Sequence, residues 1–214
     1  MIDPYAKTQD LKLQSGEFAL EARLDRAFDE KSTAGAVVAP PHPLYGGSLT
    51  NPVVQVVSEA LLEVGLSTLL FNYRGTEGSE GTATDNLDAA TTDYSAALRE
   101  LRKVAAGPVI AAGYSFGAGT ALLCARDASP LLGLVLIAPP LGMLRADDLA
   151  AFTGRVLIVV GDDDEYAPIA ELRALLAERT NVTLEVLPGV DHFFHFGGMR
   201  ALFSAVREHV RSWL

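Results

Sequence analysis

Short apolar runs separated by stretches with helical spacing make up the chain from residue 35 onward. The runs are rich in Val, Ile and Leu and barely alternate with polar residues, as expected of parallel strands covered on both faces. Strands are therefore predicted at residues 35–39, 66–72, 108–113, 133–138, 155–161 and 183–187. Earlier in the chain, a Ser15-Gly16 turn followed by alternating Phe18, Leu20, Ala22 and Leu24 predicts an antiparallel hairpin.

Helical periodicity fills the segments between these runs. The clearest helix has apolar side chains three and four positions apart, at Leu87, Ala90, Tyr94, Ala97, Leu98 and Leu101. Asn51-Pro52 predicts a helix start, because asparagine caps free N–H groups and proline has none to leave unpaired. A last helix carries Leu202, Phe203, Val206, Val210 and Trp213. The alternation predicts an α/β fold with a mostly parallel, doubly wound sheet after the antiparallel hairpin.

Composition bounds the class of protein. A chain of 214 residues with 49% hydrophobic content suits one domain, residues 1–214. No apolar run approaches the roughly 18 to 20 residues of a membrane-spanning helix. Residues 1–7 lack the basic start and apolar run of a secretory signal, so we expect a cytoplasmic protein. Cys124 is the only cysteine, which excludes an intrachain disulfide and suits a small buried side chain.

The formal net charge of −10 narrows the partners. Nucleic-acid-binding proteins present basic faces that displace counterions, so a nucleic-acid partner is not expected. Small neutral or cationic molecules fit an acidic protein better. The sequence gives no sign of the oligomeric state.

A GxSxG motif, Gly113-Tyr114-Ser115-Phe116-Gly117, lies between an apolar run and a helical stretch. In this context it predicts a nucleophile elbow, a turn so sharp that the positions two before and two after the serine must be nearly free of side chains. Both are glycine here. Ser115 is therefore the candidate nucleophile, at a helix N-terminus that favours developing negative charge. The alternative is a glycine-rich turn that only packs closely or binds a phosphate.

The general base is expected on the loop after the last strand, because in this arrangement the acid and then the histidine follow the serine. His192 has that position. His195, three residues further on, is its rival, and a solvated loop histidine is the alternative for either. His209 lies within the last predicted helix and is expected at the surface.

The acid is expected after the strand at 155–161, where Asp162-Asp163-Asp164-Glu165 follows. Spacing alone does not choose among the three aspartates. A run of acids is also compatible with a solvated loop or a hard-cation site, although no DxDxDG-like ligand spacing is present. No metal or cofactor is therefore expected. Asp191 is a weak candidate, since neighbouring side chains diverge.

An oxyanion hole needs two backbone N–H groups. Phe116, next to the nucleophile, is expected to supply one. The second should come from the loop after the strand at 35–39, where the prolines at 41 and 43 have no N–H. Leu44 is therefore the leading donor, with Tyr45 as the alternative. His42 in this loop is expected to make structural hydrogen bonds and not to act as a second base.

Taken together, the motifs resemble those of the small cap-less α/β hydrolases related to dienelactone hydrolases, many of which are described as predicted esterases. The likeness runs from about residue 35 to the C-terminus. It rests on His42-Pro43-Leu44-Tyr45-Gly46-Gly47, Asn72-Tyr73-Arg74-Gly75, the GxSxG motif, Gly161 with Asp164 and Pro168, and Asp191-His192-Phe193-Phe194. The family's GxxDxxxP-like segment, laid on Gly161 and Pro168, implies Asp164 as the acid. Dienelactone hydrolases use a cysteine nucleophile, so serine here is a departure that puts lactone specificity in doubt.

The resemblance implies a Ser-His-Asp hydrolase with an acyl-enzyme intermediate. Only residues 139–154 separate two predicted strands where larger relatives insert a cap, so the pocket should be open. Lining by Tyr45, Phe116, Met143 and Phe193 would suit small carboxylic esters or thioesters, short-chain ones above all. The alternative is a non-catalytic binding protein with the same scaffold, because fold does not fix function.

Overall fold

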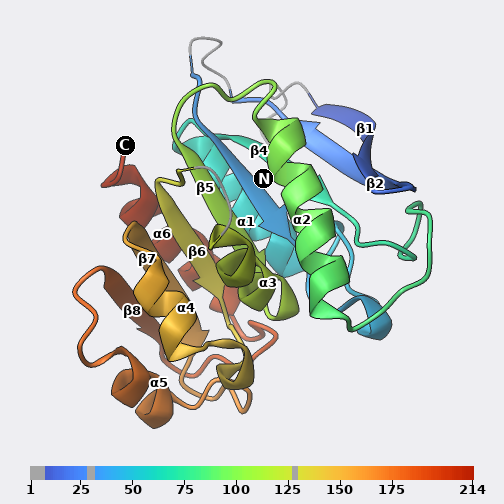
Figure 1. The fold of residues 1–214 in the computed structure, drawn as a ribbon. Helices are drawn as coiled ribbons and strands as arrows, with labels where there is room; N and C mark the ends of the chain where they lie inside the picture. Colours follow the sequence, from blue (N-terminus) through green and yellow to red (C-terminus); the bar gives the residue numbers. More distant parts are fainter. Residues whose placement is uncertain (1–7, 28–31, 127–129) are drawn as a thin grey trace.

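The computed structural model describes residues 8–27, 32–126 and 130–214. The N-terminal residues 1–7, used above to judge a secretory signal, lie outside the described residues. Within the described part, one eight-stranded sheet runs through the molecule in the order β1-β2-β4-β3-β5-β6-β7-β8 (Figure 1). The single domain predicted over residues 1–214 stays a prediction.

The sheet is antiparallel at its start and parallel afterwards. β1 pairs antiparallel with β2, β2 pairs antiparallel with β4, and every later pairing is parallel. The strands are β1 Thr8–Ser15, β2 Phe18–Asp25, β3 Gly35–Ala39, β4 Ser67–Phe71, β5 Val109–Tyr114, β6 Gly133–Ile137, β7 Arg155–Gly161 and β8 Val182–Leu187. The predicted hairpin and doubly wound sheet are thus confirmed, with strand bounds that differ by about one residue from those expected.

Helices cover both faces of the sheet. They are α1 Pro52–Glu63, α2 Leu87–Leu101, α3 Phe116–Ala125, α4 Ala146–Ala151, α5 Ile169–Leu176 and α6 Gly198–Arg211, with short 3₁₀ turns η1 Pro43–Tyr45 and η2 Leu141–Met143. α1 and α6 pack on one face, and α2 to α5 on the other, each layer enclosing its own apolar cluster (Figure 1). Burial on both faces explains why the parallel strands read as continuous apolar runs.

Local signals set the helix starts. Asn51 accepts a hydrogen bond from the N–H of Val53, 2.9 Å away, and Pro52 opens α1 as predicted.

The last helix ends earlier than expected. α6 stops at Arg211, and Trp213 lies in the turn beyond it, packed against Gly133 at the start of β6. The indole keeps its apolar contact with the sheet, although the backbone there is no longer helical.

Two adjacent strands define where a ligand can bind. β3 and β5 are neighbours in the sheet, yet the helix after β3 packs on one face and the helix after β5 on the other. Such a switch point leaves a crevice at the carboxyl ends of the strands. Between β6 and β7, only η2 and the six-residue α4 intervene, so no cap domain covers this edge. Within the described residues, no helix has the length and apolar character required to span a bilayer.

Candidate active site

Ser115 lies in the sharp turn between β5 and α3. Its backbone has φ 53°, ψ −116°, a conformation that residues other than glycine rarely adopt. The turn closes because both flanking glycines lack a side chain. A Cβ on Gly113 would lie 2.3 Å from the Gly117 backbone, and one on Gly117 would lie 2.5 Å from the carbonyl oxygen of Pro40. The serine hydroxyl is thereby held above the carboxyl end of β5.

Ser115, His192 and Asp164 form one hydrogen-bonded series. The Oγ of Ser115 lies 3.0 Å from Nε2 of His192, and Nδ1 of His192 lies 2.8 Å from Oδ2 of Asp164. His192 and Asp164 are buried. Three loops, after β5, β7 and β8, therefore bring the predicted nucleophile, base and acid together.

The three aspartates that follow β7 differ in their hydrogen-bond partners and exposure. The second oxygen of Asp164 accepts the backbone N–H groups of Tyr166 and Ala167, 2.8 and 3.2 Å away, which fixes the carboxylate toward His192. Asp162 turns the other way and accepts the N–H of Gly189 at 2.6 Å. Asp163 is exposed. Within the described residues, no group of three acidic, histidine or cysteine side chains converges as a metal ion would need.

The other histidines have different partners. Nδ1 of His195 lies 2.7 Å from the carboxylate of Asp191, at the surface. The His195 N–H also donates to Asp191 and is the main cause that lowers the pKa of this carboxyl. His209 on α6 lies 3.2 Å from Glu185, partly exposed. Neither histidine reaches Ser115, which distinguishes His192 from its rival.

The loop after β3 does not offer the N–H expected from Leu44. That group donates to Nδ1 of His42, 3.2 Å away, and the N–H of Tyr45 donates to the His42 carbonyl at 3.1 Å. Burial lowers the pKa of His42, with the charge of Asp85 opposing the shift, so the imidazole is neutral and accepts. The N–H of His42 itself makes no hydrogen bond to the described residues. The geometry therefore favours His42 over Leu44 as the free donor on this loop.

A pocket of about 470 Å³ opens onto Ser115. Its lining includes the predicted Tyr45, Phe116, Met143 and Phe193, while Leu44 is not part of it. Tyr45 is 87% exposed and Phe193 56% exposed, so both lie at the mouth. The open mouth follows from the missing cap.

Sequence reasoning missed two aromatic residues of the site. The hydroxyl of Tyr114 donates to the carbonyl oxygen of His192 at 3.0 Å, and the Tyr166 ring lies 4.7 Å from the His192 ring. Both line the pocket. Tyr114 lies inside the GxSxG motif, and Tyr166 lies two residues after Asp164. Their positions in the sequence, next to the proposed catalytic residues, are the signal that indicates a place in the site.

Fold and site together define an α/β hydrolase arrangement, with a serine poised at an elbow beneath an uncovered pocket. A family model described as alpha/beta hydrolase domain matches residues 45–200. The chain belongs to this family, in its small form without a cap.

Solved structures agree with this assignment. An α/β serine hydrolase homologue from Coxiella burnetii is 30% identical, with a TM-score of 0.85 over 94% of this chain and 97% of its own. An α/β serine hydrolase without a lid from Xanthomonas campestris is also 30% identical, with a TM-score of 0.86 over 97% and 95% of the two chains. An uncharacterised protein of Rickettsia prowazekii is 28% identical over 82% of this chain and 79% of its own. The structural neighbours support a hydrolase.

Proposed function

We propose that the protein is a serine hydrolase that cleaves small carboxylic esters or thioesters through an acyl-enzyme. The observation that carries this proposal is the series from Ser115 Oγ to His192 Nε2, 3.0 Å, and from His192 Nδ1 to Asp164 Oδ2, 2.8 Å, at the wall of a pocket. Nucleophile and base within hydrogen-bond reach, with the base oriented by a third group, are the requirement for nucleophilic catalysis.

The chemistry follows from the three side chains. His192 Nε2 takes the proton of Ser115 as the oxygen attacks the substrate carbonyl, and it returns that proton to the leaving alcohol or thiol. A water, deprotonated by the same nitrogen, then frees the acid. Asp164 holds the imidazole with Nδ1 protonated and stabilises the imidazolium; its own position depends on the N–H groups of Tyr166 and Ala167.

Two backbone N–H groups would hold the oxyanion. Phe116 is the first residue of α3, and its N–H has no acceptor within the helix. For the second donor we propose His42 in place of Leu44, because the Leu44 N–H is already bonded to the His42 ring. The His42 ring lies 4.7 Å from the Phe116 ring, so the two loops meet beside Ser115.

The proposed reaction needs no cofactor. The finer likeness to dienelactone hydrolases stays a prediction, and the serine at the elbow argues for ester or thioester over lactone chemistry. Tyr45, Met143 and Phe193 are proposed to contact the substrate, because they line the pocket that holds Ser115.

The test is hydrolysis of p-nitrophenyl esters from acetate to octanoate by wild type and Ser115→Ala, together with labelling by a fluorophosphonate. Removing the nucleophile of such a triad lowers kcat by on the order of a millionfold, so Ser115→Ala should be inactive and unlabelled. His192→Ala should be inactive as well.

An equal melting temperature of wild type and Ser115→Ala shows that the variant is folded. A Ser115→Ala enzyme that keeps about a tenth of the wild-type rate would contradict the proposed nucleophile, given those magnitudes. A wild type that neither hydrolyses any ester nor takes the label would favour a binding protein on the same scaffold.

A further inference from the structure

The wall of the pocket above Ser115 is mostly apolar. The described residues that line it include no lysine, arginine, aspartate or glutamate; aromatic rings, Pro41, Pro140 and Met143 make up most of its wall. At about 470 Å³ it is within the range of roughly 300 to 1,000 Å³ typical of pockets for drug-sized molecules. An acetyl ester would leave most of this space to water.

Exposed apolar side chains gather on the loops around this pocket. Among the described residues, the large hydrophobic side chains exposed to solvent are Leu44, Tyr45, Leu87, Tyr166, Phe193, Phe196 and Leu214. All but Leu87 and Leu214 lie on the loops after β3, β7 and β8. Three of them, Tyr45, Tyr166 and Phe193, line the pocket, and we call these three the aromatic rim. Scattered exposed side chains are ordinary, but a cluster at the mouth of a pocket marks a binding surface.

The rim reaches the proposed reacting groups. The ring centroids of Tyr166 and Phe193 lie 4.7 and 5.4 Å from that of His192, and the Tyr45 ring lies 4.7 Å from that of His42. A substrate whose ester bond sits at Ser115 therefore has aromatic side chains beside its remaining groups. Aromatic pairs gain free energy beyond the area they bury, which favours an aromatic substituent.

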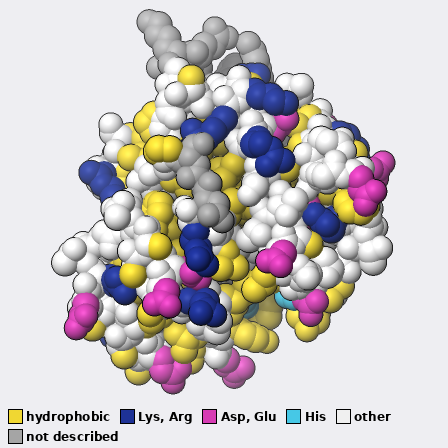
Figure 2. Space-filling view, in the orientation of Figure 1, with side chains coloured by type: hydrophobic (Ala, Val, Ile, Leu, Met, Phe, Trp, Pro, Cys, Tyr) yellow, Lys and Arg dark blue, Asp and Glu magenta, His cyan; other side chains and the backbone are white. Residues whose placement is uncertain are grey.

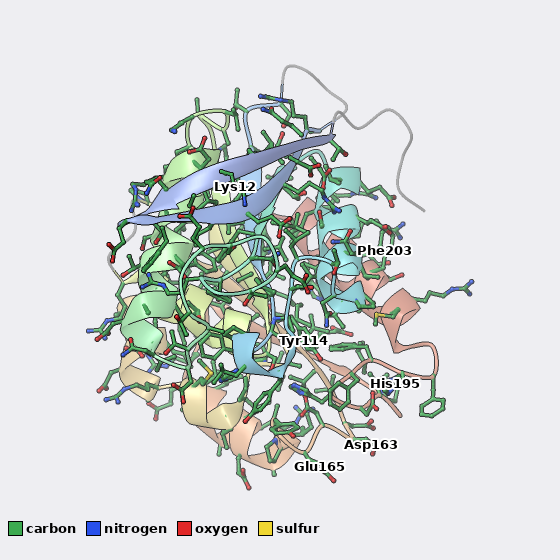
Figure 3. All side chains as sticks on the ribbon, turned by 90° about the vertical axis from the view of Figure 1, so that its right-hand side faces the viewer. Lys12, Tyr114, Asp163, Glu165, His195 and Phe203 are labelled. Carbon is green, nitrogen blue, oxygen red and sulfur yellow. The ribbon has the colours of Figure 1, made fainter. Side chains whose placement is uncertain are left out.

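Acidic side chains lie on the loops after β7 and β8, close in sequence to residues that line the pocket. Asp163 and Glu165 are exposed on the loop that carries Tyr166, and Asp191 precedes His192. In Figure 3, Asp163 and Glu165 lie near the lower edge of the molecule, with His195 above them on the right and Tyr114 nearer the middle. Along the lower edge of the face in Figure 2, acidic and hydrophobic side chains lie together.

We propose that the site selects uncharged esters with an aromatic or bulky apolar group and discriminates against esters that carry an ionised carboxylate. This inference rests on the proposed function and names its substrate class. A carboxylate about 10 Å from one acid is disfavoured about twofold in water, so the three acids together would give about eightfold at that separation. Added salt should reduce that factor, because charges at the mouth are screened over about 10 Å at 0.1 M.

Matched substrates separate charge from size. The series is methyl 3-phenylpropanoate, its 4-carbamoyl derivative and its 4-carboxylate derivative, with kcat/KM measured at low ionic strength and in about 0.5 M salt. The 4-carbamoyl and 4-carboxylate substituents are also compared on benzyl acetate, in which the ring belongs to the alcohol of the ester and not to the acid. We expect the carboxylate to react about eightfold more slowly than the carbamoyl compound in at least one series, with a smaller gap in salt. Equal kcat/KM values in both series would overturn the charge selection.

Charge-neutral variants assign the effect to named groups. Asp163→Asn combined with Glu165→Gln should narrow the gap between carboxylate and carbamoyl substrates. Asp10→Asn combined with Glu208→Gln removes the same formal charge from exposed positions on β1 and α6 and should leave the gap unchanged. An equal effect of both pairs would mean that net charge alone is responsible, contrary to the proposal.

The aromatic preference has its own comparison. Methyl 3-phenylpropanoate and benzyl acetate should each be compared with the substrate that lacks the ring, methyl propanoate or methyl acetate, and at least one should have about tenfold higher kcat/KM. Phe193→Ala should narrow that ratio, whereas Leu214→Ala, an exposed side chain at the C-terminus, should not. Ratios near one in both series would overturn the role of the rim.

Failure of this inference differs from failure of the proposed function. Turnover of all the esters without discrimination would leave a serine hydrolase of a different substrate class. Turnover of none would remove the hydrolase proposal and this inference with it. A rate that rises only when a long-chain ester forms aggregates would indicate that the aromatic rim binds a lipid surface, which would contradict the proposal.

Discussion

The hydroxyl of Tyr114 donates a hydrogen bond to the backbone carbonyl of His192, 3.0 Å away, and so ties the residue before the proposed nucleophile to the residue that carries the proposed base. Burial raises the pKa of Tyr114, and the charges of Asp164 and Asp191 raise it further, so the phenol stays protonated and donates. The loop after β8 contains Phe194 at φ 57° and Phe196 at φ 52°. A loop with such backbone strain needs anchoring contacts to keep His192 in place.

Tyr114→Phe should therefore lower kcat by about three- to tenfold, with KM close to that of wild type, because the ring stays in the pocket while the anchor of His192 is lost. The buried carbonyl loses its partner, at a cost of about 1 to 3 kcal/mol in the free energy of unfolding. Steady-state kinetics and thermal unfolding of the same preparations measure both effects.

Tyr94→Phe is the matched control. Tyr94 on α2 is also buried, and its hydroxyl donates to the carbonyl of Ala112 in β5 at 2.8 Å. Its loss should lower the free energy of unfolding by a similar amount and leave kcat unchanged. If both variants lose kcat in proportion to stability, Tyr114 has only a structural role.

Most of the fold could be predicted because its signals are local. Apolar runs, the Asn51-Pro52 helix start and the alternating N-terminal segment each act through neighbouring residues, and the structure has elements within about one residue of them. The spacing of Trp213 continues the apolar face of the last helix and so predicts a helical position for it. Helix ends depend on capping and on tertiary contacts, here between the indole and Gly133, which periodicity does not contain.

The site could be predicted less completely. The order of motifs pointed to Ser115 and His192, but the residues alone left three aspartates open, and only the family pattern favoured Asp164. That choice depends on which carboxylate a turn directs inward, since Asp162 instead bonds Gly189. The oxyanion donor depends on the hydrogen bonds inside a proline-rich loop, and proline positions alone do not determine which N–H remains free.

His42→Pro should lower kcat by about a hundred- to a thousandfold relative to His42→Ala, if the His42 N–H holds the oxyanion. Both substitutions remove the imidazole that accepts the Leu44 N–H, but only proline removes the backbone donor. The φ of His42 is −58°, a value that proline adopts without strain. Ester hydrolysis under saturating substrate measures the ratio.

The same pair tests the earlier prediction for Leu44. If His42→Ala is as impaired as His42→Pro, the ring or the loop conformation matters and the N–H of His42 is not the donor. Leu44→Pro then becomes the informative variant. Melting temperatures and circular dichroism of the variants establish whether a substitution in this loop has disturbed the fold.

Asp191→Asn should lower the melting temperature near neutral pH by about 1 to 3 °C, the effect expected of weakening the exposed hydrogen bonds of one carboxylate in a chain of this size. The carboxylate accepts the His195 N–H, the first cause of its lowered pKa, and pairs with the His195 ring at 2.7 Å. Asparagine retains an oxygen for the N–H and removes only the charge. The comparison therefore isolates what the charge of Asp191 contributes to the stability of the turn that holds His192.

The sign of the pH dependence follows from the direction of that pKa shift. A carboxyl whose pKa is lower in the folded state than its ordinary 3.8 stabilises the fold above that ordinary value, and the contribution is lost as the pH falls through the folded pKa. The difference in melting temperature between wild type and Asp191→Asn should therefore be full near pH 7 and vanish in strong acid. Asp163→Asn, an exposed aspartate with no side-chain bond to the described residues, is the control. A wild-type advantage that stays undiminished well below pH 3.8, where the Asp191 carboxyl is protonated in both the folded and the unfolded chain, would contradict the proposed charge interaction.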